Sequence, residues 1–134
     1  NGVSGNDEIL EYLDFEENPQ AINPSLNYVY SANNQPDSIA GVLYPGYYLN
    51  EDRAKRIVSL LDPKNDWTKD EVANMIYDVT SLNAPLIVVD FVKSIDKSGL
   101  TASQKKALNV LSNWKGNFEK QEVGAVIYNR LVYV

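Results

Sequence analysis

The sequence predicts a mainly α-helical domain with one short β segment near its N-terminal end. Two observations indicate helices: apolar residues recur at helical spacing from residue 50 onward, and two Thr-x-x-Glu/Gln capping boxes stand ahead of such runs. The third observation is a Tyr- and Val-rich run, Leu26–Ala32, which is typical of a strand. The chain has 134 residues, 44% of them hydrophobic, which suits a single domain with a modest core. Along this domain we expect an extended and strand segment over 1–36, a loop over 37–49 and a helical region over 50–134.

The β segment ends abruptly at Asn33-Asn34-Gln35-Pro36, a typical turn composition. The loop that follows contains Gly41, Pro45 and Gly46 among apolar neighbours, so we expect it to be ordered and packed on its apolar side chains. A single strand cannot satisfy its backbone groups alone and needs a sheet from elsewhere. The exposed edge of Leu26–Ala32 therefore predicts pairing with another part of a larger protein, or self-association.

The first predicted helix follows Asn50, which suits an N-cap. It ends at Asp62, because the residue before a proline avoids the α region. We expect two i, i+4 ion pairs on this helix, Glu51 with Lys55 and Asp52 with Arg56. Its apolar stripe consists of Ala54, Ile57, Val58 and Leu61.

The second predicted helix has the clearest start in the chain, because Thr68 and Glu71 form a capping box. A third begins near Pro85, which suits a first turn, and Gly99 is a natural residue to follow its end. The buried stripe expected of the second helix is Val72, Met75, Ile76 and Val79. That of the third is Val88, Phe91, Val92 and Ile95.

A fourth helix is predicted after Thr101, which forms a capping box with Gln104, and it ends at Trp114-Lys115-Gly116. The last segment, 122–134, has apolar spacing that fits a helix and β-branched residues that also fit a strand. The spacing favours a helix. The predicted architecture is thus a strand and a loop followed by about five helices.

Composition excludes several functions. The formal net charge is -6, which argues against binding to nucleic acid or to an anionic membrane surface. The absence of cysteine excludes disulfides and thiol catalysis, and no apolar run is long enough to span a membrane. Glu16-Glu17 and the acidic residues at 7, 8 and 11 have no apolar surroundings that would raise a pKa. We interpret them as a solvated acidic surface, and we expect no metal site.

One side chain nevertheless suggests chemistry. Asn33 stands at the end of the predicted strand, where a carboxamide can be a fixed hydrogen-bond donor for the oxyanion of an acyl-transfer reaction. The plainer interpretation is that both asparagines form a turn, with Asn34 as the more typical turn former. The chain has no histidine or cysteine, and residue 1 is Asn1, so a donor is present without a nucleophile. This combination predicts a part of an enzyme rather than a whole one.

Several stretches together resemble the middle of the large subunit of penicillin acylases. They are Tyr12-Leu13-Asp14-Phe15-Glu16-Glu17-Asn18-Pro19, Ile22-Asn23-Pro24, Tyr28 to Pro36, Asp52 to Ile57 with Leu60-Leu61, Trp67-Thr68, Asp78 to Ser81, Ser98 to Thr101 and Trp114-Lys115-Gly116. Their order and approximate spacing match those of the family over nearly the whole chain. The resemblance implies an N-terminal-nucleophile hydrolase, so that the chain would be an α+β fragment of its four-layer αββα fold, with the helical insertion.

The resemblance also implies roles for individual residues. Asn33 matches the oxyanion-hole asparagine of the family, and Arg53 matches the arginine that braces the nucleophile region. The nucleophile of the family is a serine exposed by autoproteolytic processing, whose own α-amino group is the base. Family members bind a structural calcium ion, but the divergent stretch between Pro36 and Arg53 has no aspartate at the expected place. We therefore expect calcium, if anywhere, in the parent enzyme, and no cofactor in this fragment.

These implications define the expected function. The parent would hydrolyse a linear amide through an acyl-enzyme, as in antibiotic metabolism, whereas the isolated fragment would be inactive. Its partners would be the rest of the large subunit, the small subunit and a small acylated amide, in the periplasm or outside the cell. Tyr44 and Tyr47 are weaker candidates for substrate contact, since loop tyrosines more often only pack.

Two alternatives remain open. The chain could be a non-catalytic helical interaction domain with an inherited acylase-like fold. It could also be a stand-alone binding protein with its pocket in the loop from Tyr44 to Tyr48.

Overall fold

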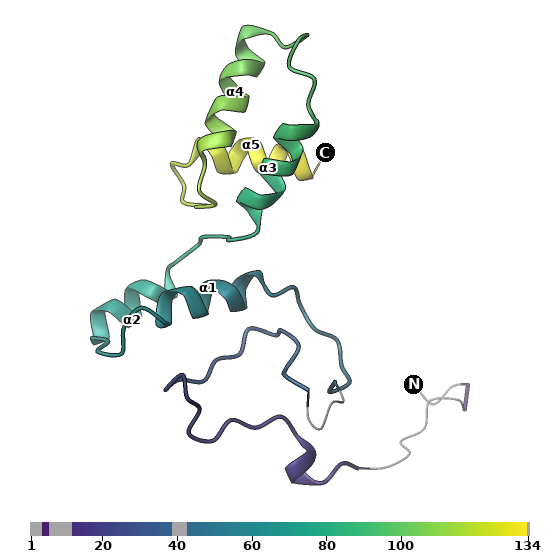
Figure 1. Cartoon of the computed structure of the whole chain (residues 1–134), viewed down its shortest axis with the longest axis vertical. Coiled ribbons are helices and arrows are strands. Elements are labelled where there is room, and N and C mark those ends of the chain that lie inside the picture. Colours follow the sequence, from purple (N-terminus) through teal and green to yellow (C-terminus); the bar gives the residue numbers. More distant parts are fainter. Residues whose placement is uncertain (1–3, 6–11, 39–42, 134) are drawn as a thin grey trace. The chain divides into compact units, whose positions relative to one another are not determined.

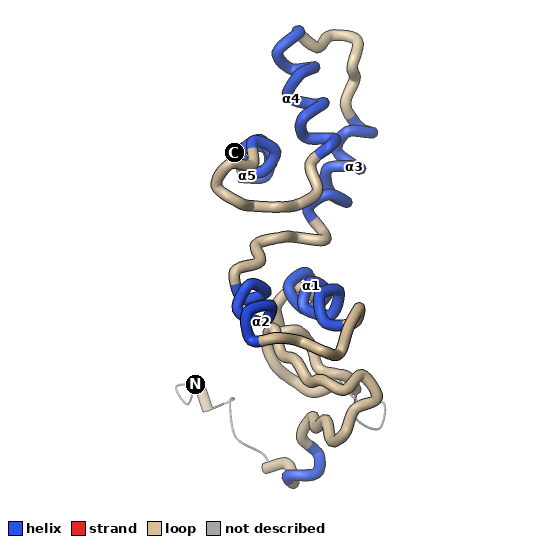
Figure 2. Tube along the Cα trace, turned by 90° about the vertical axis from the view of Figure 1, so that its left-hand side faces the viewer, coloured by secondary structure: helices blue, strands red, loops and turns tan. Residues whose placement is uncertain are grey.

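The computed structural model describes residues 4–5, 12–38 and 43–133 (Figure 1). The chain divides into two compact units, Asn1–Asn50 and Glu51–Val134, and each is described here by itself. The mainly helical prediction is confirmed, because five α-helices fill most of the second unit. The described segments contain no strand, so none of them corresponds to the sheets of the αββα fold (Figure 2).

The part of the first unit that the structure describes contains little regular structure. Its one described helical element is the 3₁₀ turn η1 (Phe15–Glu17), which Glu17 closes by accepting a hydrogen bond from the Asp14 N–H at 2.8 Å. Ala32 is the one residue described in this unit that is buried. Side chains such as Phe15 and Ile22 are largely exposed. The fold of this unit therefore depends on hydrogen bonds more than on a core.

The predicted strand Leu26–Ala32 is not formed in this structure. Residues 28–31 are irregular, and Leu26 and Val29 are exposed. The physical reason is the one that the sequence suggested, because an isolated strand has no ladder to satisfy its N–H and C=O groups. The predicted apolar packing of the loop is also wrong for its described part, since Leu43 and Tyr47 are exposed. Residues 39–42 of that loop lie outside the described residues.

The second unit begins with α1 (Asp52–Leu61) and α2 (Lys69–Ile76). Helix α1 ends at Asp62 as predicted, but its N-cap is Glu51 rather than Asn50. The capping box of α2 is confirmed, because the Thr68 N–H donates to Glu71 and the Glu71 N–H donates to the Thr68 hydroxyl.

The buried stripe predicted for α2 is wrong. Ile76 is 75% exposed, and Val72 and Val79 are exposed as well. The apolar side of this short helix has no cover in the described part of the chain, which the periodicity alone could not reveal.

The core of the second unit lies among α3 (Ala84–Ser94), α4 (Ala102–Asn113) and α5 (Val123–Val132), with α4 packed against both neighbours (Figure 1). The buried cluster consists of Ala84, Val88, Leu111, Trp114, Ala125 and Tyr128. Phe91, Val92, Phe118 and Ile127 pack against it. The final segment is thus a helix, as the apolar spacing predicted.

The ends of α3 and α4 match the prediction only in part. Helix α3 ends at Ile95, with an extended cap, so Gly99 is not the residue that follows its C-terminus. The capping box of α4 is present, with Thr101 and Gln104 bonded to each other's backbone N–H groups. The end of α4 turns back through Gly116, and Trp114 donates from Nε1 to the Asn117 carbonyl at 2.7 Å.

A short antiparallel contact holds the entry of α3 against the exit of α4. The Ser81 N–H donates to the Gly116 carbonyl at 2.9 Å, and the Phe118 N–H donates to the Val79 carbonyl at 3.1 Å. Thr80 and Asn117 face each other as an isolated bridge. This isolated β-bridge connects two loops that are far apart in sequence.

Candidate functional site

Asn33 occupies a defined backbone turn in the first unit. Its φ is 59°, in the left-handed region that asparagine tolerates better than most residues. Its carbonyl oxygen accepts a hydrogen bond from the Leu49 N–H at 2.7 Å, and the residue is exposed. The peptide group of Asn33 is therefore held by a contact 16 positions along the chain.

Asn34 closes the turn from the other side. Its Oδ1 accepts a hydrogen bond from the N–H of the buried Ala32 at 3.2 Å, and its Nδ2 donates to the Gln35 carbonyl at 3.2 Å. Asn34 thus behaves as the turn former that the sequence suggested. Its carboxamide is engaged with the local backbone.

A chain of side-chain hydrogen bonds ties this turn to the rest of the unit. Gln35 Nε2 donates to the Tyr44 carbonyl at 2.8 Å, and the Tyr44 hydroxyl donates to Asn18 Oδ1 at 2.9 Å. Asn18 in turn donates from Nδ2 to the carbonyls of Asp14 and Phe15, both at 3.2 Å. Residues 14–18, the Asn33 turn and Tyr44 are therefore connected through polar groups in a unit that has almost no apolar core.

The two tyrosine candidates differ in their surroundings. Tyr44 is half-buried, and its hydroxyl is bonded to Asn18, so its structural task is to join two segments. Tyr47 is 94% exposed. A substrate contact by either residue stays a prediction.

Arg53 is the second residue of α1 and is exposed. It belongs to the second unit, whereas Asn33 belongs to the first. The neighbours of Arg53 along α1 make contacts that the sequence did not predict. Asp52 and Arg56 do not pair with each other, although Glu51 and Lys55 do form the predicted surface pair at 3.1 Å.

Asp52 and Arg56 both bind the segment that leads into α3. Asp52 Oδ1 accepts hydrogen bonds from the Leu82 and Asn83 N–H groups at 2.9 and 3.0 Å. Arg56 donates from Nε and Nη2 to the two carboxylate oxygens of Asp78 at 2.8 and 2.6 Å. This bidentate arrangement is the strongest geometry for an arginine–carboxylate pair.

Asp78 has a second function in the same segment. Its Oδ1 also accepts the Thr80 N–H at 3.0 Å, so it braces the backbone before α3. The hydrogen bond from Arg56 lowers the pKa of Asp78, and the Thr80 N–H adds to that effect. The sequence Asp78-Val79-Thr80-Ser81 could have indicated this turn, because Asp and Ser often bind the backbone a few positions further on. Asp78 accepts the Thr80 N–H, and the Ser81 hydroxyl accepts the Ala84 N–H.

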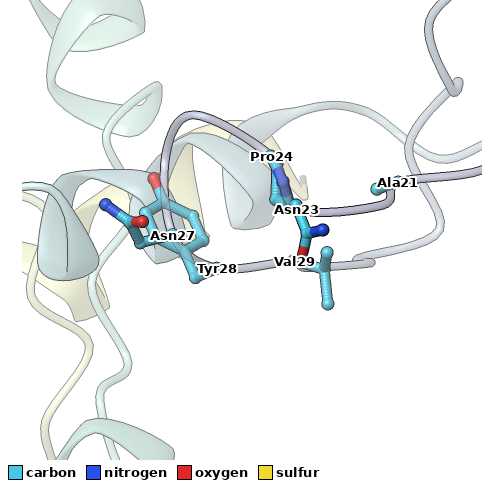
Figure 3. A pocket seen from close by; sticks show the side chains of 6 residues that line it. All are labelled: Ala21, Asn23, Pro24, Asn27, Tyr28 and Val29. Atoms are coloured by element: carbon cyan, nitrogen blue, oxygen red, sulfur yellow. The ribbon is translucent and has the colours of Figure 1, made fainter.

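A hollow of about 440 Å³ lies in the first unit beside the turn from Pro24 to Asn27 (Figure 3). The turn is closed by the Asn27 N–H, which donates to the Pro24 carbonyl at 3.0 Å. The hollow is lined by Ala21, Asn23, Pro24, Asn27, Tyr28 and Val29. None of the predicted site residues belongs to this lining, and it carries no carboxylate or cation, so the hollow suggests no acid–base chemistry.

The described residues do not supply a calcium site. Over 4–5, 12–38 and 43–133, no three acidic, histidine or cysteine side chains come together in a way that could hold a metal ion. No described helix is long and apolar enough to cross a membrane.

The comparison with known protein families agrees with the resemblance found in the sequence. The profile of the penicillin amidase family matches residues 1–134, which is the whole chain. This match supports a hydrolase parent for the mainly helical chain, and the chain belongs to the penicillin amidase family. No curated protein and no solved structure matches it significantly.

Proposed function

We propose that this chain is the part of a penicillin-amidase-type amidohydrolase that supplies the oxyanion donor, Asn33, and a site-organising cation, Arg53. Membership of the family supports the hydrolase class. The observation that carries the assignment of Asn33 is its turn, in which the backbone is held through Leu49 while the residue is exposed. Such a donor is useful because it needs no reorganisation when charge develops.

In the proposed mechanism, the nucleophile is an N-terminal serine supplied by a part of the parent outside this sequence. Its hydroxyl attacks the carbonyl carbon of a small acylated amide, and the hydroxyl proton passes to the serine's own α-amino group. Asn33 Nδ2 donates a hydrogen bond to the carbonyl oxygen as it becomes negative. The leaving amine then takes the proton, and water hydrolyses the acyl-enzyme. Without that serine, the isolated chain would not hydrolyse amides.

Replacement of Asn33 in the full-length parent enzyme tests this proposal. The sharpest variant is Asn33→Gly, because glycine accepts the φ of 59° without strain and removes only the carboxamide. We expect kcat to fall by about 10²–10³, the usual cost of losing one oxyanion donor. Asn33→Ala should lose at least as much, since it adds backbone strain.

The matched control is Asn23→Gly. Asn23 also has left-handed backbone, with φ 48°, is an exposed residue of the first unit and lies outside Leu26–Ala32. We expect this variant to retain its kcat. A parent enzyme in which Asn33→Gly turns over at nearly the normal rate would refute the role of Asn33.

The partners follow from the same proposal. The chain would assemble with the rest of the large subunit and with the small subunit, and Leu26–Ala32 would become a strand only when a sheet from those parts receives it. In their absence, that edge would pair with a second copy. A periplasmic or extracellular location and autoproteolytic maturation belong to this proposal.

A non-catalytic interaction domain is the second candidate. The exposed apolar side chains on α3 and α5, among them Leu86 and Val126, favour contact with other protein surfaces. The parent reading frame distinguishes the two candidates. A serine that becomes N-terminal by processing, upstream of this segment, supports the hydrolase, and its absence supports the interaction domain.

A further inference from the structure

The backbone just before helix α3 is held by a side chain from another helix. The residue at its own N-cap position, Asn83, makes no side-chain capping hydrogen bond, although asparagine is well suited to one. Asp52 Oδ1 instead accepts the N–H groups of Leu82 and Asn83 at 2.9 and 3.0 Å. A carboxylate here also meets the positive end of the α3 dipole. The first residue of α1 is therefore attached to the two residues that precede α3.

A second attachment lies one turn further along α1. Arg56 binds both oxygens of Asp78 at 2.8 and 2.6 Å, and Asp78 accepts the Thr80 N–H at 3.0 Å. The Arg56 and Asp78 side chains are only 26% and 21% exposed, so solvent screens this pair less than a surface pair. Arg56 thus connects α1 to the same segment that Asp52 reaches.

These two attachments determine how α1 is rotated about its axis. Asp52 and Arg56 are four positions apart, so they lie on one face of the helix, one above the other. A single contact would let the helix roll, whereas two contacts on one face prevent it. Arg53 follows Asp52 by one position and projects about 100° around the helix from it. The direction of Arg53 is therefore set by Asp52 and Arg56.

We propose that Asp52 and Arg56 are positioning residues for Arg53, which they aim by fixing the rotation of α1 against residues 78–83. The catalytic consequence rests on the proposed function, in which Arg53 organises the active site. The aiming of Arg53 is a property of this chain and can be measured without catalysis.

The first measurement uses NMR on the chain itself. Asp52→Asn weakens these two hydrogen bonds, so we expect the Leu82 and Asn83 amides to exchange with solvent at least tenfold faster. The Arg53 Nε–H resonance should shift and show lower order, because the side chain samples more directions. Glu51→Gln is the matched control, since it removes one negative charge at the adjacent position, where the carboxylate only pairs with Lys55 on the surface. It should leave both readouts unchanged.

The second measurement uses kcat of the full-length parent enzyme. We expect Asp52→Asn to lower kcat by about tenfold to hundredfold, the scale for a small misplacement of a site group, with KM within twofold. Arg56→Lys should do the same more weakly, because lysine keeps the charge but lacks the bidentate fork. On an Arg53→Ala background, Asp52→Asn should cost no more than twofold further, because a residue that acts through Arg53 has nothing left to position.

Each outcome decides a different point. An Arg53 resonance that is as ordered in Asp52→Asn as in Glu51→Gln overturns the positioning role. So does an equal loss of kcat with and without Arg53, which would indicate general destabilisation. If the unmodified parent hydrolyses no amide, the proposed function fails, and the NMR comparison alone decides whether Asp52 aims Arg53.

Discussion

Replacement of Gly116 by alanine tests how the core of the second unit is closed. Gly116 is buried, with φ +86°, and a Cβ placed there would overlap the Ser81 carbonyl oxygen and lie 3.0 Å from the Pro85 ring carbons. The Ser81 carbonyl is backbone and cannot rotate away. Its residue is also fixed by the Ser81 N–H bond to the Gly116 carbonyl at 2.9 Å. Backbone strain and steric overlap therefore act together at this position.

Two other glycines separate these terms. A Cβ on Gly124, in the first turn of α5, would lie 2.5–2.6 Å from Trp114 side-chain atoms, but this glycine has ordinary helical backbone. A Cβ on Gly99 would meet nothing within 4 Å, and its φ is not in the left-handed region. Gly116 thus has both backbone strain and steric overlap, Gly124 has steric overlap alone, and Gly99 has neither.

The expected magnitudes follow from these geometries. Left-handed backbone costs alanine about 1–2 kcal/mol, and forcing a methyl into a packed site costs about 1–3 kcal/mol. Every Gly→Ala change gains about 0.4–1 kcal/mol by restricting the unfolded chain. Gly116→Ala should therefore destabilise the second unit by about 1–4.5 kcal/mol and Gly124→Ala by roughly 0–2.5 kcal/mol. Gly99→Ala should stabilise it by roughly 0.4–1 kcal/mol.

Urea unfolding followed by far-UV circular dichroism measures this series. The five α-helices that the structure describes lie in the second unit, so the helical signal reports on that unit. The decisive comparison is between Gly116→Ala and Gly99→Ala, which make the same chemical change. If their unfolding free energies differ by less than about 0.5 kcal/mol, the usual range for a featureless surface change, the closure through Gly116 is wrong.

Two further predictions concern the core and the α2 cap. Leu111 is 2% exposed in the core cluster, so Leu111→Ala should lower the free energy of unfolding by about 2–5 kcal/mol in the same assay, and a loss below 1 kcal/mol would contradict the assigned core. The hydrogen bond from Lys64, with those from Thr68, lowers the pKa of Glu71 to about 2. Because the folded pKa lies below the unfolded one, this cap stabilises α2 fully above about pH 4.5 and loses that effect as pH falls toward about 2. NMR titration should show the Glu71 pKa rising in Lys64→Gln, and an unchanged pKa would refute the pairing.

Much of the helical unit follows from residues that are close together in sequence. The capping boxes at Thr68 and Thr101 were predicted and are present, because each involves a side chain and a backbone group three positions apart. Pro85 in the first turn of α3 and the stop before Pro63 are local in the same sense.

The errors concern contacts with distant residues. The stripe of α2 has the right spacing to be buried, but Ile76 is exposed because no described segment covers it. Leu26–Ala32 has strand composition, yet strand formation requires a neighbour that the described part of this chain does not provide. Asp52 and Arg56 have the spacing of an ion pair, but each finds a better partner 22 or more positions away. Periodicity shows which side chains share a face, and it does not show what meets that face.

The candidate site divides in the same way. Asn33 and Arg53 could be selected from a family resemblance carried by short stretches of sequence, and the family itself is confirmed over residues 1–134. The hydrogen bond from Leu49 that holds Asn33 and the attachments that aim Arg53 needed the folded chain. Helix starts and turn residues are decided by interactions within a few positions, so the sequence alone is enough to predict them. The partners of a carboxylate or a guanidinium are decided by whichever groups the folded backbone brings within about 3 Å, and no spacing rule encodes that.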